Sequence, residues 1–232
     1  PRDGTSFYAP LRGVGLGLTA APKLFGPQAR TGIVGLGAGT LACYRRPGQD
    51  WRFYEIDPVI AQIARDKSAF TFLADCAPQA PIAIGDARLV LAREAGRMPA
   101  LDVLAIDAFS SDSVPMHLLT REAFDLYGKR MTPSGLLLVH ISNRFLDLQP
   151  VIAAAAKAGG WHVARRIYLP GAESAGHHYM SSDWIALSRD STTIARLKTE
   201  NPQLWDALPP AEGFSAWSDQ RASILGILKI GR

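Results

Sequence analysis

Cysteine is scarce in this 232-residue chain, which contains only Cys43 and Cys76. Two cysteines cannot build a disulfide framework, and because both stand among apolar neighbours we expect reduced, buried thiols. Long apolar runs are missing too, since no stretch approaches the roughly 18 residues of a membrane-spanning helix. No signal peptide is visible either. Together these absences favour a cytoplasmic protein without a membrane segment.

Runs of like charge are also lacking. Lys and Arg number 25 against 21 Asp and Glu, a formal net charge of +4, yet the basic residues are scattered and no aromatic residues are interleaved with them. We therefore expect no nucleic-acid partner. His177 and His178 are adjacent, but no nearby Cys, Asp or Glu completes a ligand set at usable spacing, so no metal is expected.

Short apolar segments alternate with helical stretches along most of the chain. Strands are predicted at residues 31–35, 51–56, 82–85, 101–106, 136–141, 161–169 and 184–187, and a helical stretch follows each of the first five. This alternation is typical of βαβ units. We predict an α/β fold with a doubly wound, mostly parallel seven-stranded sheet and helices on both faces. One domain should span residues 1–232, with residues 1–29 as a lead-in segment.

A glycine-rich turn follows the first predicted strand, where Gly35, Gly37 and Gly39 alternate with larger residues. Small residues there let the backbone approach a ligand closely, and the start of the next helix offers free N–H groups. Glu55 ends the second predicted strand, 20 residues after Gly35. A carboxylate in that place can accept hydrogen bonds from both hydroxyls of an adenosine ribose.

A second acidic group, Asp86, follows the third predicted strand and suits the amino group of an adenine. A nicotinamide-binding protein would share this geometry, but its glycines are spaced G-x-G-x-x-G to house a pyrophosphate. In this chain Gly39 comes one residue after Ala38, and position 40 is Thr. The spacing therefore favours a nucleoside without a pyrophosphate.

An acidic loop follows the fourth predicted strand and contains Asp107 and Asp112. Ligands of open α/β sheets bind beyond the carboxyl ends of the strands, so both carboxylates should lie at the mouth of the site. There they could hold an ammonium group and accept a proton from an amine; for Asp112 a helix N-cap is the alternative. Asn143 lies just past the fifth predicted strand and could line the pocket, whereas His140 has the pattern of a core histidine.

Several motifs occur in a characteristic order: IVGLGAGTLA (33–42), FYEIDP (53–58), GDARL (85–89), IDAFSSDSVPMHLLT (106–120), HISNRFLDL (140–148) and WSDQRASIL (217–225). Together they resemble the polyamine aminopropyltransferases, especially the spermidine synthase-like proteins, which have a class I methyltransferase-like Rossmann fold. The resemblance implies transfer of an aminopropyl group from decarboxylated S-adenosylmethionine to an amine such as putrescine, with methylthioadenosine as product.

The same resemblance implies roles for particular residues. Asp107 would orient and deprotonate the amine with Asp112 nearby, and Tyr8 and Asn143 would border the substrate. The nucleoside would contact Gly35, Gly37, Ala38, Gly39, Glu55, Ile56, Asp86 and Ala87. A small-molecule amine is the expected partner, and a homodimer the expected assembly if the chain associates with itself.

Three features depart from the family pattern. Ala38 stands where the family usually has an Asp for the aminopropyl ammonium, the acidic motif after the fourth strand is stretched, and the family's N-terminal β segment is expected to be absent or truncated. Two alternatives therefore stay open. One is a methyltransferase that uses intact S-adenosylmethionine and releases S-adenosylhomocysteine, and the other is a nucleoside-binding module without catalysis.

Overall fold

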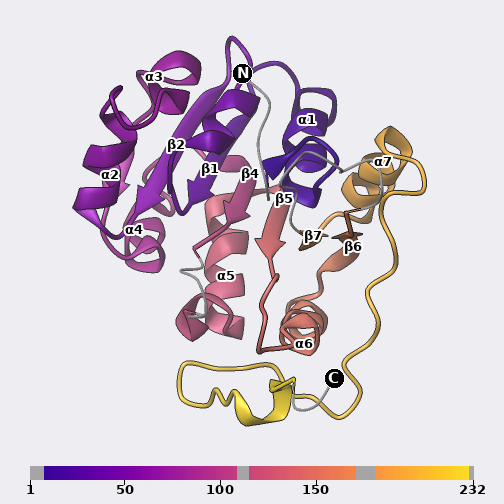
Figure 1. Cartoon of the computed structure of the whole chain (residues 1–232). Helices are drawn as coiled ribbons and strands as arrows, with labels where there is room; N and C mark the ends of the chain where they lie inside the picture. Colours follow the sequence, from indigo (N-terminus) through magenta and orange to yellow (C-terminus); the bar gives the residue numbers. More distant parts are fainter. Residues whose placement is uncertain (1–7, 109–114, 171–180, 230–232) are drawn as a thin grey trace.

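A seven-stranded sheet forms the centre of the molecule in the computed structural model, which describes residues 8–108, 115–170 and 181–229 (Figure 1). The strand order is β3-β2-β1-β4-β5-β7-β6, and β7 runs antiparallel to both of its neighbours. The strands are β1 (Arg30–Val34), β2 (Asp50–Glu55), β3 (Ile82–Ile84), β4 (Leu101–Ile106), β5 (Met131–His140), β6 (His162–Tyr168) and β7 (Ser182–Ser188). The predicted doubly wound, mostly parallel sheet of seven strands is confirmed.

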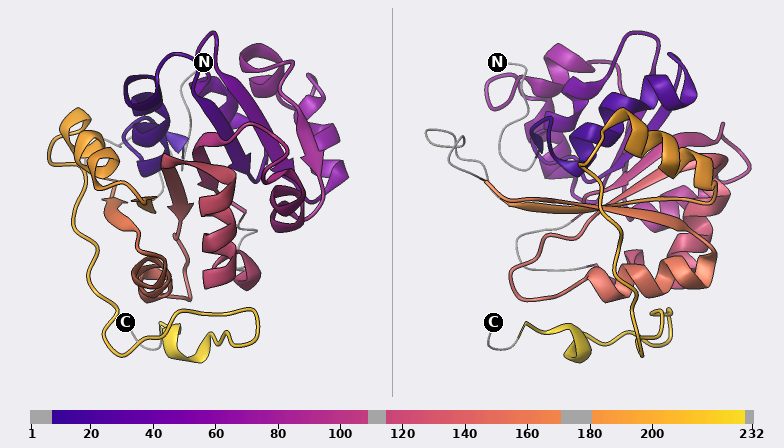
Figure 2. Two further views of the ribbon diagram at one scale, coloured as in Figure 1. Left: turned by 180° about the vertical axis from the view of Figure 1, so that it is seen from behind. Right: turned by 90° about the vertical axis from the view of Figure 1, so that its right-hand side faces the viewer.

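Helices cover both faces of this sheet, which Figure 2 shows from behind and from the side. One face carries α1 (Gly13–Phe25), α2 (Pro58–Arg65), α3 (Phe72–Cys76), α7 (Ser191–Glu200) and the 3-10 turn η2 (Thr40–Tyr44). The other face carries α4 (Ala87–Glu94), α5 (Arg121–Arg130) and α6 (Gln149–Gly159), and the chain after α7 continues around to this face, where Trp217 is buried. Two further 3-10 turns are η3 (Met116–Leu118) and η5 (Leu225–Ile227).

The sheet reverses its winding direction between β1 and β4. The chain passes outward from β1 to β2 and β3, then returns to place β4 on the other side of β1. Such a reversal leaves a crevice beyond the carboxyl ends of the two central strands, where ligands of open α/β sheets bind. The glycine turn after β1 and Asp107 after β4 both lie at this position.

Local sequence explains where the helices around this crevice begin. The Asp57 side chain accepts a hydrogen bond from the Val59 N–H, with Pro58 in the first turn of α2, and Asp86 caps α4 through the Leu89 N–H. Asp86 is therefore a helix cap as well as a residue at the end of β3. No helix in the described ranges is both long and apolar enough to cross a bilayer.

Several details differ from the sequence expectations. Residues 13–25, within the expected lead-in, form α1, which packs on β4, β5 and β7. The expectation of reduced thiols is wrong, because Cys43 of η2 and Cys76 of α3 form a disulfide. Their 33-residue separation carries no spacing signal, but the packing of η2 against α3 brings the two side chains together.

Candidate functional site

A cavity of about 370 Å³ opens at the carboxyl ends of the central strands, a volume within the range of small-molecule sites. Its walls come from the glycine turn, the ends of β2, β3 and β4, and residues 115–118. Eight of the residues expected at the site line it: Tyr8, Gly35, Gly37, Glu55, Ile56, Asp86, Ala87 and Asp107. The fold thus brings together segments that lie up to 99 residues apart in the sequence.

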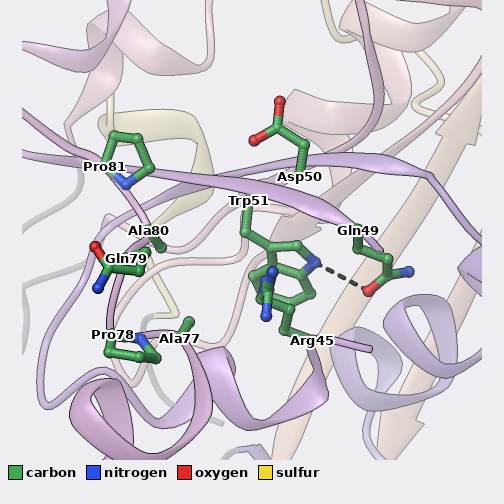
Figure 3. A pocket seen from close by; sticks show the side chains of 9 residues that line it. All are labelled: Arg45, Gln49, Asp50, Trp51, Ala77, Pro78, Gln79, Ala80 and Pro81. Carbon is green, nitrogen blue, oxygen red and sulfur yellow. Dashed lines mark hydrogen bonds between the residues drawn. The ribbon is translucent and has the colours of Figure 1, made fainter. Parts of the chain in front are cut away.

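A second cavity of about 160 Å³ lies at the opposite, amino ends of β2 and β3 (Figure 3). In it the Trp51 indole N–H donates to the Gln49 side-chain oxygen over 3.0 Å. Asp50 is the one acidic residue of its described lining, and no glycine turn borders it. The larger cavity is therefore the candidate functional site, because three acidic residues and the glycine turn line it.

Gly35 joins the two central strands at the cavity. Its φ is +94°, and a Cβ atom placed there would lie 2.2 Å from the backbone oxygen of Asp107. Only glycine fits both the backbone conformation and the space. The close approach fixes the glycine turn directly beside the residue that follows β4.

Glu55 is buried at the end of β2 and holds the glycine turn in place. One carboxylate oxygen accepts a hydrogen bond from the Leu36 N–H and the other accepts one from the Asp57 N–H, and each N···O distance is 3.0 Å. Each carboxylate oxygen can accept more than one hydrogen bond. Glu55 therefore retains acceptor capacity for the hydroxyls of a ribose in the cavity.

Asp86 is bound on both of its oxygens at the end of β3. One accepts the Leu89 N–H over 3.0 Å, and the other lies 2.8 Å from the His117 ring Nε2. His117 also lines the cavity, so it is a site residue that the sequence reasoning did not select. The sequence offered little signal, because His117 lies 31 residues from Asp86 in a short 3-10 turn.

Asp107 is held between two other groups, and its side chain is only 7% exposed. One carboxylate oxygen lies 2.8 Å from the His140 Nδ1, and the Tyr8 hydroxyl donates to the same carboxylate. Burial, followed by the charge and hydrogen bond of Asp107, raises the pKa of Tyr8 well above its usual value. Tyr8 therefore stays protonated and acts as a hydrogen-bond donor.

His140 is buried, as expected of a core histidine, and partners lie at both ring nitrogens. Its Nε2 lies 2.7 Å from the Ser142 hydroxyl, and its ring stacks on Trp184 with centroids 4.5 Å apart. One of the partners, however, is the carboxylate that faces the cavity. His140 is thus attached to the site, which its place within an apolar run did not reveal.

Four expected site residues do not line the described cavity. Ala38 and Gly39 belong to the far part of the glycine turn, and Gly39 precedes η2 with a φ of +82°. The Asn143 side-chain oxygen accepts the Phe145 and Leu146 N–H groups over 2.9 and 2.8 Å, so this side chain stabilises its own turn. Asp112 lies outside the described residues.

The described lining of the cavity is acidic. It contains the carboxylates Glu55, Asp86 and Asp107, and it contains His117 but no Lys or Arg. Within the described part of the chain, no cluster of three or more His, Cys, Asp or Glu side chains could hold a metal ion. The arrangement can accept hydrogen bonds from a nucleoside and can attract positive charge.

Comparisons with known proteins bear on this arrangement. No protein-family model matches the sequence. The chain is 29% identical over 144 residues to a polyamine aminopropyltransferase of Vibrio vulnificus, a match that covers 60% of this chain and 45% of that protein. The chain thus spans less than half the length of the curated relative that it matches.

Solved structures share the fold. A probable spermidine synthase of Corynebacterium glutamicum superposes with a TM-score of 0.64 at 21% identity, over 90% of this chain and 80% of that one. The O-methyltransferase TomG of Streptomyces achromogenes, solved with S-adenosylmethionine (SAM), superposes with a TM-score of 0.51 at 14% identity, over 75% of this chain and 78% of that one. The resemblance indicated by the motifs is confirmed, since the chain is similar in sequence to a polyamine aminopropyltransferase and shares its fold with a probable spermidine synthase.

Proposed function

We propose that this chain is a transferase that binds decarboxylated SAM and moves its aminopropyl group to a polyamine-type amine. The observation that carries the proposal is the convergence of Glu55, Asp86 and Asp107 on one cavity beside a glycine turn. The sequence similarity to a polyamine aminopropyltransferase supports the same reaction.

The charges of the cavity favour the decarboxylated donor. That donor carries a sulfonium and an ammonium, whereas intact SAM carries a carboxylate as well. The carboxylate of intact SAM would enter a cavity whose described lining contains three acidic residues and no Lys or Arg. The imidazole of His117 is already paired with Asp86. A donor with two positive charges is attracted to such a site, and an added negative charge is repelled.

Each residue of the site then has a proposed task. Glu55 accepts hydrogen bonds from the ribose hydroxyls, and Asp86 accepts one from the adenine amino group. Ile56, which is 67% exposed beside the cavity, covers the adenine together with Ala87. Tyr8 closes the cavity on the side of Asp107.

In the proposed step the neutral amine attacks the aminopropyl carbon bonded to sulfur. The N–C bond forms as the C–S bond breaks, and the electron pair of that bond returns to sulfur, which leaves as the thioether of methylthioadenosine. Asp107 accepts the proton that the attacking amine gives up. Because the sulfonium is already a good leaving group, the protein mainly aligns the amine and takes its proton.

Ala38 favours a second candidate, methyl transfer from intact SAM. An Asp at this position would pair with the ammonium of the decarboxylated donor, and removing one partner of a buried ion pair costs about 3–5 kcal/mol. Methyl transfer needs no such carboxylate. In addition, the fold is shared with a SAM-binding O-methyltransferase.

Calorimetry with both donors separates the two candidates. We expect decarboxylated SAM to bind at least about tenfold more tightly than intact SAM, with methylthioadenosine binding in the same cavity and NADH not binding. Tenfold tighter binding of intact SAM would replace the aminopropyl proposal by methyl transfer. Ala38→Asp should increase the preference for the decarboxylated donor.

Asp107→Asn tests the proposed base. The amide cannot take the proton, so turnover with putrescine should fall by about 100-fold or more while methylthioadenosine affinity stays within about threefold. Asp125→Asn, which removes only an exposed ion pair with Arg189, is the matched control and should keep full turnover. Equal activity of the two variants would remove Asp107 from the mechanism, and an inactive parent protein would indicate a nucleoside-binding module.

The disulfide bears on the cytoplasmic location expected from the sequence. That expectation rested in part on reduced cysteines, but Cys43 and Cys76 form a disulfide. Disulfides persist mainly in oxidising compartments. The cysteines therefore do not support a cytoplasmic location, which stays a prediction along with the homodimer.

A further inference from the structure

Three linked hydrogen bonds run from β7 to the cavity. The Asp183 backbone N–H donates to the Ser142 hydroxyl over 2.8 Å, and that hydroxyl lies 2.7 Å from His140 Nε2. His140 Nδ1 in turn lies 2.8 Å from an oxygen of Asp107. We propose that His140 is a positioning residue that Ser142 holds in one tautomer, so that its ring donates to Asp107 and keeps that carboxylate aimed at the cavity. The proposal rests on the role of Asp107 proposed above.

The directions of the three bonds follow from the groups that make them. A backbone N–H can only donate, so the Ser142 oxygen accepts from Asp183 and its own proton is available for His140 Nε2. A neutral imidazole has one N–H, which then lies on Nδ1 and points at Asp107. The other tautomer would place a bare nitrogen lone pair against a carboxylate, two acceptors facing each other.

The backbone and packing fix the ring in this place. His140 is the last residue of β5. The preceding residue, Val139, pairs with Ile106 at the end of β4. The side chains of residues 107 and 140 therefore start from adjacent strand ends. Stacking on Trp184 holds the ring plane, and the ring is buried. A carboxylate held by such a ring loses little freedom when a substrate arrives.

The order of Ser142, His140 and Asp107 along this hydrogen-bonded chain shows which of them meets the substrate. In a hydrolytic Ser-His-Asp triad the serine faces the substrate and the aspartate orients the histidine. In this chain Asp107 lines the cavity, whereas Ser142 is not among the described lining residues and its oxygen binds the β7 backbone. The carboxylate is therefore the group that meets the substrate, and the serine is the anchor.

Among the described residues, charged and titratable groups lie on both sides of the ring. Tyr8 and Asp107 lie on the cavity side, and Tyr8 is kept protonated. On the β7 side, Asp183 is paired with Arg165. Within this set, Asp107 is the group that accepts a proton in the proposed reaction.

Two substitutions of His140 separate the hydrogen bond to Asp107 from the one to Ser142. The amide nitrogen of Asn stands about where ring Nδ1 stands, so His140→Asn keeps a donor for Asp107. The amide nitrogen of Gln reaches toward Ser142, so His140→Gln loses that donor. We expect His140→Gln to lower kcat by about tenfold or more, with the affinity for decarboxylated SAM nearly unchanged. His140→Asn should stay within about threefold of the parent kcat, and equal losses in the two variants would overturn the proposal.

A measurement without turnover tests the tautomer directly. In the intact chain, ¹⁵N NMR of the His140 ring should show a neutral imidazole protonated on Nδ1, and Ser142→Ala should shift the Nε2 resonance through loss of its hydrogen-bond donor while Nδ1 stays protonated. An imidazolium at neutral pH, or an Nε2–H tautomer in the parent protein, would overturn the proposal even if the Gln variant fails to fold. If the parent protein aminopropylates no amine, the proposed function fails, and the NMR result alone decides the role of His140.

Discussion

Glu55 combines two tasks at the scale of a single residue, because it holds the glycine turn and presents acceptors to the cavity. Both of its oxygens accept backbone N–H groups, from Leu36 and from Asp57. The residue that would recognise the ribose is thus the residue that shapes the turn around it. Its effects on ligand binding and on stability should therefore appear together.

Glu55→Gln should weaken methylthioadenosine binding by about tenfold, since an amide has one acceptor oxygen and turns an NH₂ group toward a backbone donor. Calorimetry gives the affinity, and thermal unfolding should show a lower Tm for the same reason. Glu212→Gln, an exposed residue on the C-terminal segment, serves as the control. Unchanged affinity in the Glu55 variant would remove this residue from the proposed ribose contact.

Gly35 offers a second test at this scale. Gly26 has nearly the same φ, +90° against +94°, but open space around its Cβ position, whereas a Cβ at Gly35 would overlap Asp107. Both alanine variants should lose about 1–3 kcal/mol from backbone strain, and Gly35→Ala should lose about 2 kcal/mol or more beyond that through the overlap. Urea unfolding measures the difference, and equal losses would show that the strands do not depend on this contact.

At the scale of the elements, the disulfide joins η2 to α3 just behind the glycine turn. A cross-link over 33 residues stabilises the fold by about 3–4 kcal/mol in the chain-entropy description. The double variant Cys43→Ser/Cys76→Ser should lose about that much free energy of unfolding. Reductant should destabilise the parent protein similarly and leave the variant unchanged. A parent protein indifferent to reductant would contradict a stabilising disulfide.

The elements also show how far sequence reasoning reaches. The seven strands and the acidic residues at their ends were predicted because strand patterns and turn residues are local signals. The helix α1 was missed because it contains three glycines and Pro22 and is buried on most sides, so it has neither good propensity nor a polar stripe. The pairings of His117 with Asp86 and of His140 with Asp107 bring together residues 31 and 33 positions apart, and only the sheet topology makes them neighbours.

At the scale of the whole molecule, an acidic cavity lies in a basic protein. The chain has a net charge of +4, yet the described lining of the cavity has three acids and no Lys or Arg. Local charges therefore outweigh the net charge where a ligand binds, because exposed charges beyond about 10 Å are largely screened at ordinary salt. Net charge alone would have suggested anionic partners.

Salt should act differently on the two nucleosides. Decarboxylated SAM is a cation and methylthioadenosine is neutral, so raising NaCl from about 50 mM to about 500 mM should weaken binding of the first severalfold and leave the second nearly unchanged. Calorimetry across this range provides the measurement. Equal salt dependence would mean that the carboxylates contribute to binding through hydrogen bonds alone.

The contact between Gly35 and Asp107 makes the proposed nucleoside site and the proposed base one mechanical unit. A shift that widens the glycine turn for a bulkier donor displaces the carboxylate with it, so donor choice and proton transfer cannot be adjusted separately at this junction. Residues 115–118 border the cavity from a 3-10 turn region instead of from a strand end, and His117 meets Asp86 there through its side chain, over a distance of 2.8 Å. Engineering of a new donor preference should therefore begin at His117 and its neighbours.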